Sequence, residues 1–362
     1  MGYGRHELGV NVGIVGATGA VGGVILEELA ERRVPVNDLR LFASSDSAGT
    51  PIGWNGSTYL VEDTYNASFR GLDYVLLSAG GDATKTMVSM DICPRVAEDG
   101  AIAIDNSSAW RGDPDVPLVV AEINPQDLDE IPKGIVANPN CTTMTGAVVF
   151  GPLHEEAGLR SINVSTYQSV SGQGQEGIDE LVDQLELMLE DPQSFVTGRI
   201  DPAHLPSPGV FPEIIGFNVA PSAGSFIDRD TSEELKFVNE SRKILGLPRL
   251  AVSATCVRVP VLNGHSMKMS LGFDHPISPE RAEEILSEAP GVSLVDVPQP
   301  INASGEDAVH AGRIRRDPTI ENGLEVFVSG DNLKKGAALN AVQILEIVIV
   351  LDALVLANRK PY

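Results

Sequence analysis

A strand, a glycine-rich turn and a helix follow one another near the start of the chain, and this order constrains the fold most strongly. Residues 12–15 are apolar, residues 16–22 have the sequence Gly-Ala-Thr-Gly-Ala-Val-Gly, and a helical pattern continues to about Arg33. Glycines let a pyrophosphate approach the backbone, and a helix N-terminus attracts its negative charge. The spacing G-x-x-G-x-x-G differs from the commoner G-x-G-x-x-G, and glycines alone are a weak signal. Their place between a strand and a helix predicts a dinucleotide-binding unit.

Strands and helices continue to alternate as far as residue 137. Helical spacing predicts a helix at residues 81–97, and apolar runs predict buried strands at residues 39–43, 73–78, 101–104 and 134–137. This alternation predicts an α/β fold with a Rossmann-type, doubly wound parallel sheet. Ligands of such sheets bind beyond the carboxyl ends of the strands, so the turns that follow these strands are candidate coenzyme contacts.

The pattern changes after Cys141. Strands are predicted at residues 162–170, 251–259 and 267–273, among helices and irregular segments. The proline-rich stretch 202–221 is expected to be irregular and is a candidate subunit contact. The sequence thus predicts a dinucleotide-binding domain of residues 1–141, completed by a C-terminal helix at 336–362. An α+β domain of residues 142–335, with a mainly antiparallel sheet, is expected to serve catalysis and dimerisation.

Composition limits the partners of the chain. A formal net charge of −24 over 362 residues argues against nucleic acid, whose phosphates would be repelled. Three cysteines cannot all pair, and no basic segment followed by an apolar one opens the chain, so we expect a cytoplasmic protein. The apolar stretch 344–357 includes Glu346 and Asp352, which predicts a buried helix and no membrane anchor.

Cys141 lies where a predicted strand turns into a predicted helix, within Asn138-Pro139-Asn140-Cys141. The unpaired N–H groups and the positive dipole end of a helix favour an anion, so a thiol at this place loses its proton more readily. The alternative is a buried structural cysteine, the commoner state of a free thiol. Pro139 and the two asparagines indicate a shaped turn, which favours a nucleophile.

A thiolate nucleophile needs a partner for proton transfer, and six histidines are available. His265 is expected at a turn between two strands, where an exposed imidazole could reach into a cleft. A solvated loop histidine is the alternative. The others are less suitable: His6 lies near a terminus, His154 falls in a helix, His204 and His310 fall in loop-like segments, and His275 precedes a proline.

Three charged residues, Arg258, Glu233 and Lys236, are further candidates for the site. Arg258 falls inside an apolar strand, where a guanidinium needs an anionic partner, either a structural carboxylate or a substrate carboxylate. Glu233 and Lys236 lie three residues apart and so share one helix face, which by itself is typical of a surface ion pair.

These motifs together resemble aspartate-semialdehyde dehydrogenase, in the Gram-positive, actinobacterial-type branch of that family. The resemblance is carried in family order by residues 16–22, 105–111, 138–141, 165–172, 233–236, 256–261, 264–266 and 331–338. It covers nearly the whole chain. It implies the reversible, NADP-dependent reductive dephosphorylation of L-4-aspartyl phosphate to L-aspartate 4-semialdehyde, a step toward lysine, methionine, threonine and diaminopimelate.

The resemblance also implies a role for each matching residue. Cys141 corresponds to the nucleophile that forms an acyl-enzyme, His265 to the acid/base, and Gln168 to the amide that positions the substrate. Arg258 corresponds to the residue that binds the substrate carboxylate, and Glu233 to the residue that faces its ammonium group.

Phosphate and coenzyme contacts are implied in the same way. The implied phosphate-binding residues are Arg111, Lys236 and Asn140. The implied coenzyme contacts are Gly16, Thr18, Gly19, Ala20, Val21, Ser44, Asp46, Ser47, Ser171, Gly172 and Asn332. The resemblance implies small-molecule substrates, no metal, no membrane, and a homodimer or tetramer.

The chain departs from the family at two places. Asp46 stands where relatives commonly have an arginine that holds the 2′-phosphate of NADP, and an aspartate could instead accept from the 2′-hydroxyl of NAD. Met267 and Lys268 follow Ser266 where many relatives have a glutamate, which puts the support of His265 in question.

Two other functions remain as alternatives. An N-acyl-glutamyl-phosphate reductase shares the acyl-phosphate chemistry, but its substrate has no free ammonium group for Glu233 to face. A non-catalytic dinucleotide-binding sensor would leave Cys141, His265, Gln168 and Arg258 without a role.

Overall fold

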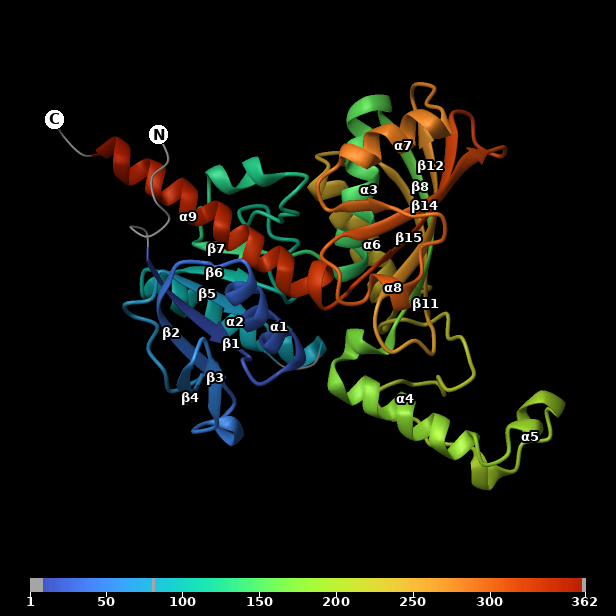
Figure 1. The fold of residues 1–362 in the computed structure, drawn as a ribbon, viewed down its shortest axis with the longest axis horizontal. Helices are drawn as coiled ribbons and strands as arrows, with labels where there is room; N and C mark the ends of the chain where they lie inside the picture. The colour runs from blue at the N-terminus through green and yellow to red at the C-terminus, as the bar shows by residue number, and fades with distance from the viewer. Residues whose placement is uncertain (1–8, 80–81, 360–362) are drawn as a thin grey trace. The chain divides into compact units, whose positions relative to one another are not determined.

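The computed structural model describes residues 9–79 and 82–359, and the chain divides into two compact units (Figure 1). The first unit comprises Met1–Asn140, Glu240–Leu247 and Leu333–Tyr362, and the second comprises Cys141–Asn239 and Pro248–Asn332. Each unit contains one large sheet. Gly80 and Gly81, which fall between the predicted strand 73–78 and the predicted helix 81–97 and at the start of that helix, respectively, lie outside the described residues. The last three residues of the predicted C-terminal helix also lie outside them.

The first unit contains a seven-stranded sheet in the order β3-β4-β2-β1-β5-β6-β7. Its strands are β1 (Val10–Val15), β2 (Val36–Ala43), β3 (Pro51–Trp54), β4 (Ser57–Asp63), β5 (Tyr74–Leu77), β6 (Ile102–Asp105) and β7 (Ile135–Ala137). All neighbouring strands are parallel except β3 and β4, which form an antiparallel hairpin at the edge. The predicted Rossmann-type parallel sheet is confirmed. The prediction missed the edge hairpin and began the second strand at residue 39, three residues late.

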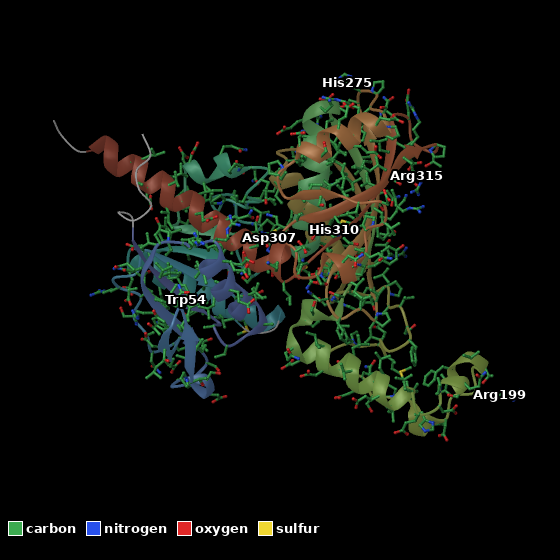
Figure 2. The ribbon with its side chains drawn as sticks, viewed as in Figure 1. Trp54, Arg199, His275, Asp307, His310 and Arg315 are labelled. Atoms are coloured by element: carbon green, nitrogen blue, oxygen red, sulfur yellow. The ribbon has the colours of Figure 1, made fainter. Side chains whose placement is uncertain are left out.

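Helices α1 (Ala20–Glu31), α2 (Asp82–Glu98) and α9 (Leu339–Arg359) belong to this unit. Helix α2 packs on β6, and α1 and α9 share one apolar cluster with the sheet. Ile25 of α1 and Leu345 of α9 are fully buried in the same cluster as Ile14 of β1, so α1 and α9 cover one face of the sheet. The indole Nε1 of Trp54 donates to the carbonyl oxygen of Leu26 at 2.8 Å, which fastens the edge hairpin to α1 (Figure 2).

The stretch Lys334–Val355 is long and apolar enough to cross a membrane, and half of its most apolar part is buried. A single helix of this kind is weak evidence for a membrane span, because core helices of soluble proteins pass the same test. Its first turns pack in the core of the first unit, as predicted. Its later turns differ from that prediction, since Val350 and Leu354 are 55% and 56% exposed.

The second unit contains a six-stranded sheet in the order β11-β8-β12-β15-β14-β13. Its strands are β8 (Leu159–Gln168), β11 (Ala251–Arg258), β12 (His265–Phe273), β13 (Val292–Leu294), β14 (Val309–Asp317) and β15 (Gly323–Gly330). The inner pairs are antiparallel, but β11 pairs with β8, and β13 with β14, in parallel. The predicted mainly antiparallel sheet is confirmed, and its two edge pairs are the parallel ones. The chain between β8 and β11 is long enough for the crossover that a parallel pair needs.

Helix α3 (Cys141–Ala157) is buried along most of its length and packs on β8 and β12. Helix α7 (Pro279–Glu288) packs beside α3, on β13 and β14. The remaining helices of this unit are α4 (Gln175–Met188), α5 (Pro192–Thr197) and α8 (Pro300–Ala303), and helix α6 (Ser232–Ile244) begins in this unit. A two-stranded hairpin, β9 (Phe226–Ile227) and β10 (Asp230–Thr231), precedes α6. Residues 202–221 are irregular apart from the short 3-10 helix Pro202–His204 and an isolated bridge at Ala220, as predicted.

Candidate active site

Cys141 is the first residue of α3 and is partly exposed, whereas the other two cysteines are buried. Burial raises the pKa of the Cys256 thiol to about 12, with smaller contributions from nearby acidic groups, Glu233 first, and from Cys141. Burial also holds the pKa of Cys93 well above its ordinary value. Both of these thiols stay protonated at neutral pH. Cys141 is the cysteine whose place at a helix N-terminus suits a nucleophile.

His265 is the first residue of β12 and is fully buried. The prediction of an exposed turn histidine is wrong, because His265 already pairs with Gly330 of β15 inside the sheet. Burial lowers the pKa of His265 to about 3, Arg258 lowers it further, and Glu233 opposes the shift. The ring is therefore neutral at physiological pH, and both charged side chains act on it. Of the other histidines, His310 lies in β14 and not in a loop, and His275 is exposed after β12 (Figure 2).

The tautomer of His265 follows from one hydrogen bond. The backbone N–H of Ser169 donates to Nδ1 at 3.1 Å. A backbone N–H can only donate, so Nδ1 accepts and the neutral ring carries its hydrogen on Nε2. Among the described residues, Nε2 of His265 and Nε2 of Gln168 are buried and have no hydrogen-bond partner. Unpaired buried polar atoms are rare, and these two are candidates for bonding to a substrate.

The backbone of Ser169 bonds two predicted site residues, Arg258 and His265, although no role was predicted for Ser169 itself. Its carbonyl oxygen accepts from Nη1 of Arg258 at 2.7 Å, while its N–H fixes His265. Its hydroxyl donates to Oδ1 of Asn332 at 2.8 Å, and Asn332 also bonds Ser171. At the positions where many relatives have a glutamate, Met267 is buried and Lys268 pairs with Glu325 at 2.8 Å, while the described contacts of the His265 ring come from Ser169.

Gly172 shows how closely Arg258 and His265 approach each other. A Cβ atom added at Gly172 would lie 3.1 Å from Nη1 of Arg258 and 3.4 Å from Cε1 of His265. Both side chains therefore border the space that this glycine leaves open. Arg258 ends β11 and pairs with Gln168 at the end of β8, which brings Gln168 to the same edge of the sheet.

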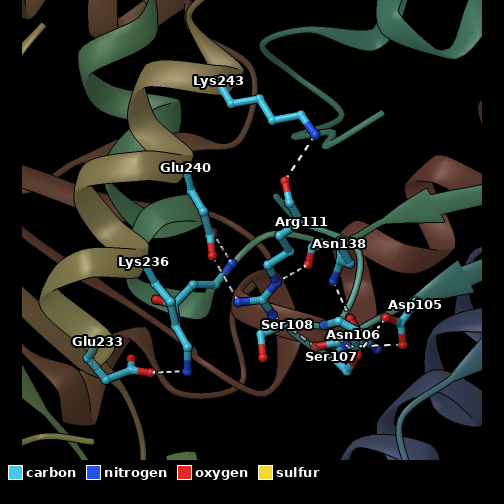
Figure 3. A network of polar contacts seen from close by, with 12 residues as sticks. Asp105, Asn106, Ser107, Ser108, Arg111, Asn138, Glu233, Lys236, Glu240 and Lys243 are labelled. Atoms are coloured by element: carbon cyan, nitrogen blue, oxygen red, sulfur yellow. Dashed lines mark hydrogen bonds and ion pairs between the residues drawn. The ribbon is translucent and has the colours of Figure 1, made fainter. Parts of the chain in front are cut away.

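Glu233 and Lys236 owe their positions to the start of α6. Thr231 and Glu234 form a capping box, in which Thr231 N–H donates to Glu234 Oε2 at 2.7 Å and Glu234 N–H donates to Thr231 Oγ1 at 3.3 Å. Glu233 thereby falls in the first turn, and Lys236 donates to its Oε1 at 2.7 Å (Figure 3). Their side chains are only 8% and 20% exposed, so they do not form a surface pair.

Arg111 and Asn140 lie in the first unit, where Glu240 contacts both. Figure 3 shows the contact between Arg111 and Glu240. Nη1 of Arg111 pairs with Glu240 Oε1 at 3.0 Å, and the backbone N–H of Asn140 donates to Glu240 Oε2 at 2.6 Å. Arg111 also donates to the carbonyl oxygens of Asn106 and Asn138 at 2.9 Å each. This network ties the loop after β6 to the loop after β7.

The turn between β1 and α1 fits a dinucleotide. Gly16 has a φ of +87°, and a Cβ atom there would lie 2.4 Å from the carbonyl oxygen of Ser78. Gly19 is the N-cap of α1 and makes no side-chain cap bond, so Ala20 and Val21 begin the helix with backbone N–H groups available to an anion. Thr18, on the same turn, is exposed.

The second predicted coenzyme segment follows β2. Ser44 is the N-cap of the 3-10 helix Ser45–Ser47, which includes Asp46. The strands β1 and β2 are parallel neighbours, and the N–H of Gly16 donates to the carbonyl oxygen of Phe42 at 2.8 Å, so both segments lie at one sheet edge. Ser44 and Asp46 are exposed and Ser47 is partly buried. The other predicted coenzyme contacts, Ser171, Gly172 and Asn332, belong to the second unit.

The fold and this constellation define a semialdehyde dehydrogenase. Residues 11–131 match the family model "Semialdehyde dehydrogenase, NAD binding domain", and residues 150–335 match "Semialdehyde dehydrogenase, dimerisation domain". The chain is 53% identical to an aspartate-semialdehyde dehydrogenase of Streptomyces akiyoshiensis over 94% of its length and 98% of the relative's. It is 48% identical to that of Mycolicibacterium smegmatis over 93% and 98%.

A solved structure agrees with these relatives. Aspartate semialdehyde dehydrogenase II of Vibrio cholerae, complexed with ASA, superposes with a TM-score of 0.88 at 39% identity, covering 94% of this chain and 98% of that one. The chain belongs to the aspartate-semialdehyde dehydrogenase family, whose members are NAD(P)-dependent oxidoreductases acting on an aldehyde group in amino-acid biosynthesis. The predictions of the fold class, the enzyme class and the actinobacterial-type branch are confirmed. The reductase and sensor alternatives are not favoured.

The buried His265 predicts a loss of stability at acidic pH. Its folded pKa, about 3, lies below the ordinary value of 6.5, so the unfolded chain binds more protons between these values. The stabilising contribution is complete above pH 6.5 and decreases by about 1.4 kcal/mol per pH unit as the pH falls toward 3. We expect urea unfolding at fixed protein concentration to show a smaller fall from pH 7.5 to pH 5.5 in His265→Asn than in the wild type.

An exposed histidine provides the control for this measurement. His275→Asn makes the same substitution at an exposed position outside the site, so it shows the effect of a histidine-to-asparagine change by itself. If the unfolding free energy fell by the same amount from pH 7.5 to pH 5.5 in His265→Asn and in the wild type, His265 would not be held as a neutral, buried ring.

Proposed function

We propose that the chain catalyses the reversible, NADP-dependent reductive dephosphorylation of L-4-aspartyl phosphate to L-aspartate 4-semialdehyde through a thioester on Cys141. The observation that carries the proposal is the gathering of one buried neutral imidazole, one buried arginine and one buried carboxylate in the unit whose helix begins at Cys141. We assign coenzyme binding to the first unit, and catalysis and dimerisation to the second.

Cys141 attacks the acyl carbon of the substrate as a thiolate. A carbon–sulfur bond forms, the bond from the acyl carbon to the phosphate oxygen breaks, and the phosphate leaves with its electron pair. The N-terminus of α3 favours the thiolate. Lys236 and Arg111, with the side chain of Asn140, are the proposed phosphate-binding groups, since cationic N–H donors suit phosphate oxygens. Glu240 already bonds Arg111, so Arg111 would act there as part of an ion pair.

His265 acts through the hydrogen on Nε2. Because Nδ1 accepts from Ser169, the neutral ring presents one donor, which would bond the oxygen of the tetrahedral intermediate. When bound, a nicotinamide coenzyme would supply the hydride for reduction of the thioester. When the tetrahedral oxygen re-forms a carbonyl, the carbon–sulfur bond breaks, the aldehyde is released and Cys141 returns as a thiolate. Gln168, whose buried Nε2 has no partner among the described residues, is proposed to position the acyl group.

Two oppositely charged side chains would bind the amino-acid part of the substrate. Arg258 presents a planar guanidinium to the α-carboxylate, and Glu233 presents a carboxylate to the α-ammonium group. Both side chains are buried and act on the same imidazole, which is consistent with one binding site. This pair also favours a substrate with a free ammonium group over an N-acylated one.

A direct assay of NADP reduction tests the proposed function. The wild type should reduce NADP in the presence of L-aspartate 4-semialdehyde and phosphate, with little reaction when phosphate is left out. An N-acyl-glutamate semialdehyde should be a much poorer substrate. A chain that binds coenzyme but turns over neither aldehyde would be a sensor, and the proposed reaction would be wrong.

The choice of coenzyme depends on Asp46. Its carboxylate lies in the segment that would meet the ribose, where it would repel a 2′-phosphate, while the hydroxyls of Ser44 and Ser47 could still bond one. Losing one charge-assisted bond costs about 1.5–3 kcal/mol, or roughly ten- to a hundredfold in affinity. We therefore expect NADP to be used with weak discrimination against NAD.

Asp46→Arg should sharpen the NADP preference by roughly tenfold or more in the ratio of the two kcat/KM values. Asp46→Asn removes the negative charge without adding a positive one, so it should fall between the wild type and Asp46→Arg. If the wild type already rejects NAD by several orders of magnitude, Asp46 does not face the ribose and its role in coenzyme choice fails.

We propose a cytoplasmic homodimer. The family model that matches residues 150–335 is described as a dimerisation domain. The irregular stretch after α5 exposes Val210, Phe217 and Val219 at 42%, 52% and 60%, which suits a subunit contact. Light scattering on the purified chain should give twice the mass of 38.4 kDa, and a fourfold mass would indicate a tetramer.

A further inference from the structure

The guanidinium of Arg258 lies over an aromatic ring that the mechanism so far does not use. Its Cζ is 5.5 Å from the centre of the Phe211 ring. Both side chains are buried, with 5% and 6% of their surface exposed. A cation within about 6 Å of a ring centre is attracted by the negative face of the ring, and the attraction is stronger where water is excluded.

Phe211 is itself held in place on two sides. Its ring belongs to a small apolar cluster with Val170, Leu181, Ile215 and Ala220. The backbone N–H groups of Val210 and Phe211 donate to Oε2 of Glu180 on α4, at 2.6 and 3.2 Å. The ring is therefore fixed by packing and the backbone beneath it by hydrogen bonds, although the segment has no regular secondary structure.

The irregular segment that contains Phe211 also forms hydrogen bonds with the backbone of Arg258. The N–H of Arg258 donates to the carbonyl oxygen of Ala220 at 2.7 Å, and the N–H of Ala220 donates to that of Arg258 at 2.9 Å. With the bond from Nη1 to Ser169, the arginine is held at its backbone, at one nitrogen and across one face of its plane. These contacts set the direction of the guanidinium.

We propose that Phe211 is a positioning residue that orients Arg258 toward the α-carboxylate of the substrate, a role that rests on the proposed function. An aromatic face has a particular advantage beneath a substrate-binding arginine. It stabilises the buried cation without occupying the in-plane N–H donors, whereas a carboxylate partner would bond those donors and compete with the substrate. An aliphatic side chain would fill the space but would not attract the guanidinium.

The test compares two substrates that differ by one group. L-Aspartate 4-semialdehyde carries the α-carboxylate, and 3-aminopropanal is the same molecule without it. Phe211→Leu should raise KM for the semialdehyde by about tenfold, with a smaller change in kcat. It should leave kcat/KM for 3-aminopropanal and KM for NADP as they are in the wild type. Phe211→Tyr keeps the ring face and should retain the wild-type KM.

Matched variants make the outcomes distinct. Phe195 is another phenylalanine of the same unit whose ring contacts Phe217, at a centroid distance of 6.1 Å, so Phe195→Leu should change neither substrate's kinetics. Should Phe211→Leu fail to fold, Phe211→Met, which keeps the apolar volume, carries the same prediction. The inference is overturned if Phe211→Leu affects both aldehydes equally, if it affects neither, or if Phe211→Tyr behaves like Phe211→Leu. A wild type that turns over no semialdehyde would instead overturn the proposed function.

Discussion

Cys141→Ser should abolish turnover, by about a thousandfold or more, while the protein stays folded and still binds NADP. A serine hydroxyl at the N-terminus of α3 does not ionise usefully near neutral pH, so neither the thioester nor its hydride transfer can follow. Incubating the wild type with an acyl phosphate, without coenzyme, should add the acyl mass to Cys141. The variant should show no such mass shift.

The other cysteines provide the control for this prediction. Cys93 is buried in α2, and its pKa is held well above the ordinary value, so Cys93→Ala should keep activity and acylation at the wild-type level. If Cys141→Ser retained a tenth of the wild-type activity, the covalent mechanism would be wrong even if the family assignment stands.

The dinucleotide-binding segment, which local sequence determines, was predicted correctly. The strand, turn and helix at residues 12–33 form a continuous segment, and Gly16 adopts a positive φ that other residues rarely take. The edge hairpin of the first unit was missed although its turn is also local. Asn55 and Gly56 have φ values of 48° and 77°, as in a type I′ turn, and Asn-Gly is the strongest short-range hairpin signal.

The strands after residue 273 were missed for a different reason. Leu324, Val326 and Val328 of β15 lie on one face of the strand, but Phe327 on the other face is also apolar, so the alternation that predicts a strand is incomplete. β14 carries a register shift between Gly312 and Arg315, which interrupts the alternation along the strand. The two parallel edge pairs depend on long crossovers, and no local pattern encodes which strands become neighbours.

The candidate site likewise combines features that local sequence determines with features that depend on distant residues. The position of Cys141 follows from the order of turn and helix, which is local. The burial of His265 depends on pairing with β15 and on Ser169, which is 96 residues away in the sequence, so its neutral state could not be predicted. The pairing of Arg258 with Phe211 is equally non-local. A family resemblance indicates which residues act, but their protonation states and supports come from the packing.

Arg258→Lys should damage substrate use far more than coenzyme binding. Arg258 can bond a carboxylate through two in-plane N–H groups while Nη1 bonds the carbonyl oxygen of Ser169. A lysine ammonium is a compact point charge and cannot reproduce that planar geometry, nor can it lie flat on the ring of Phe211. Each charge-assisted bond is worth about 1.5–3 kcal/mol, so the loss of two predicts a fall in kcat/KM for the semialdehyde of roughly a hundredfold or more.

The dissociation constant of NADP separates a substrate role of Arg258 from a structural one. It should stay at the wild-type value in Arg258→Lys, since the proposed contacts of Arg258 are with the substrate. Arg313→Lys, at an exposed position of β14, is the matched control and should leave all kinetic constants unchanged. The carboxylate-free aldehyde sharpens the comparison, because its kcat/KM should fall little in Arg258→Lys. If KM and kcat for the semialdehyde were nearly unchanged, Arg258 would be a structural cation of the β8–β11 edge, and another group would have to bind the carboxylate.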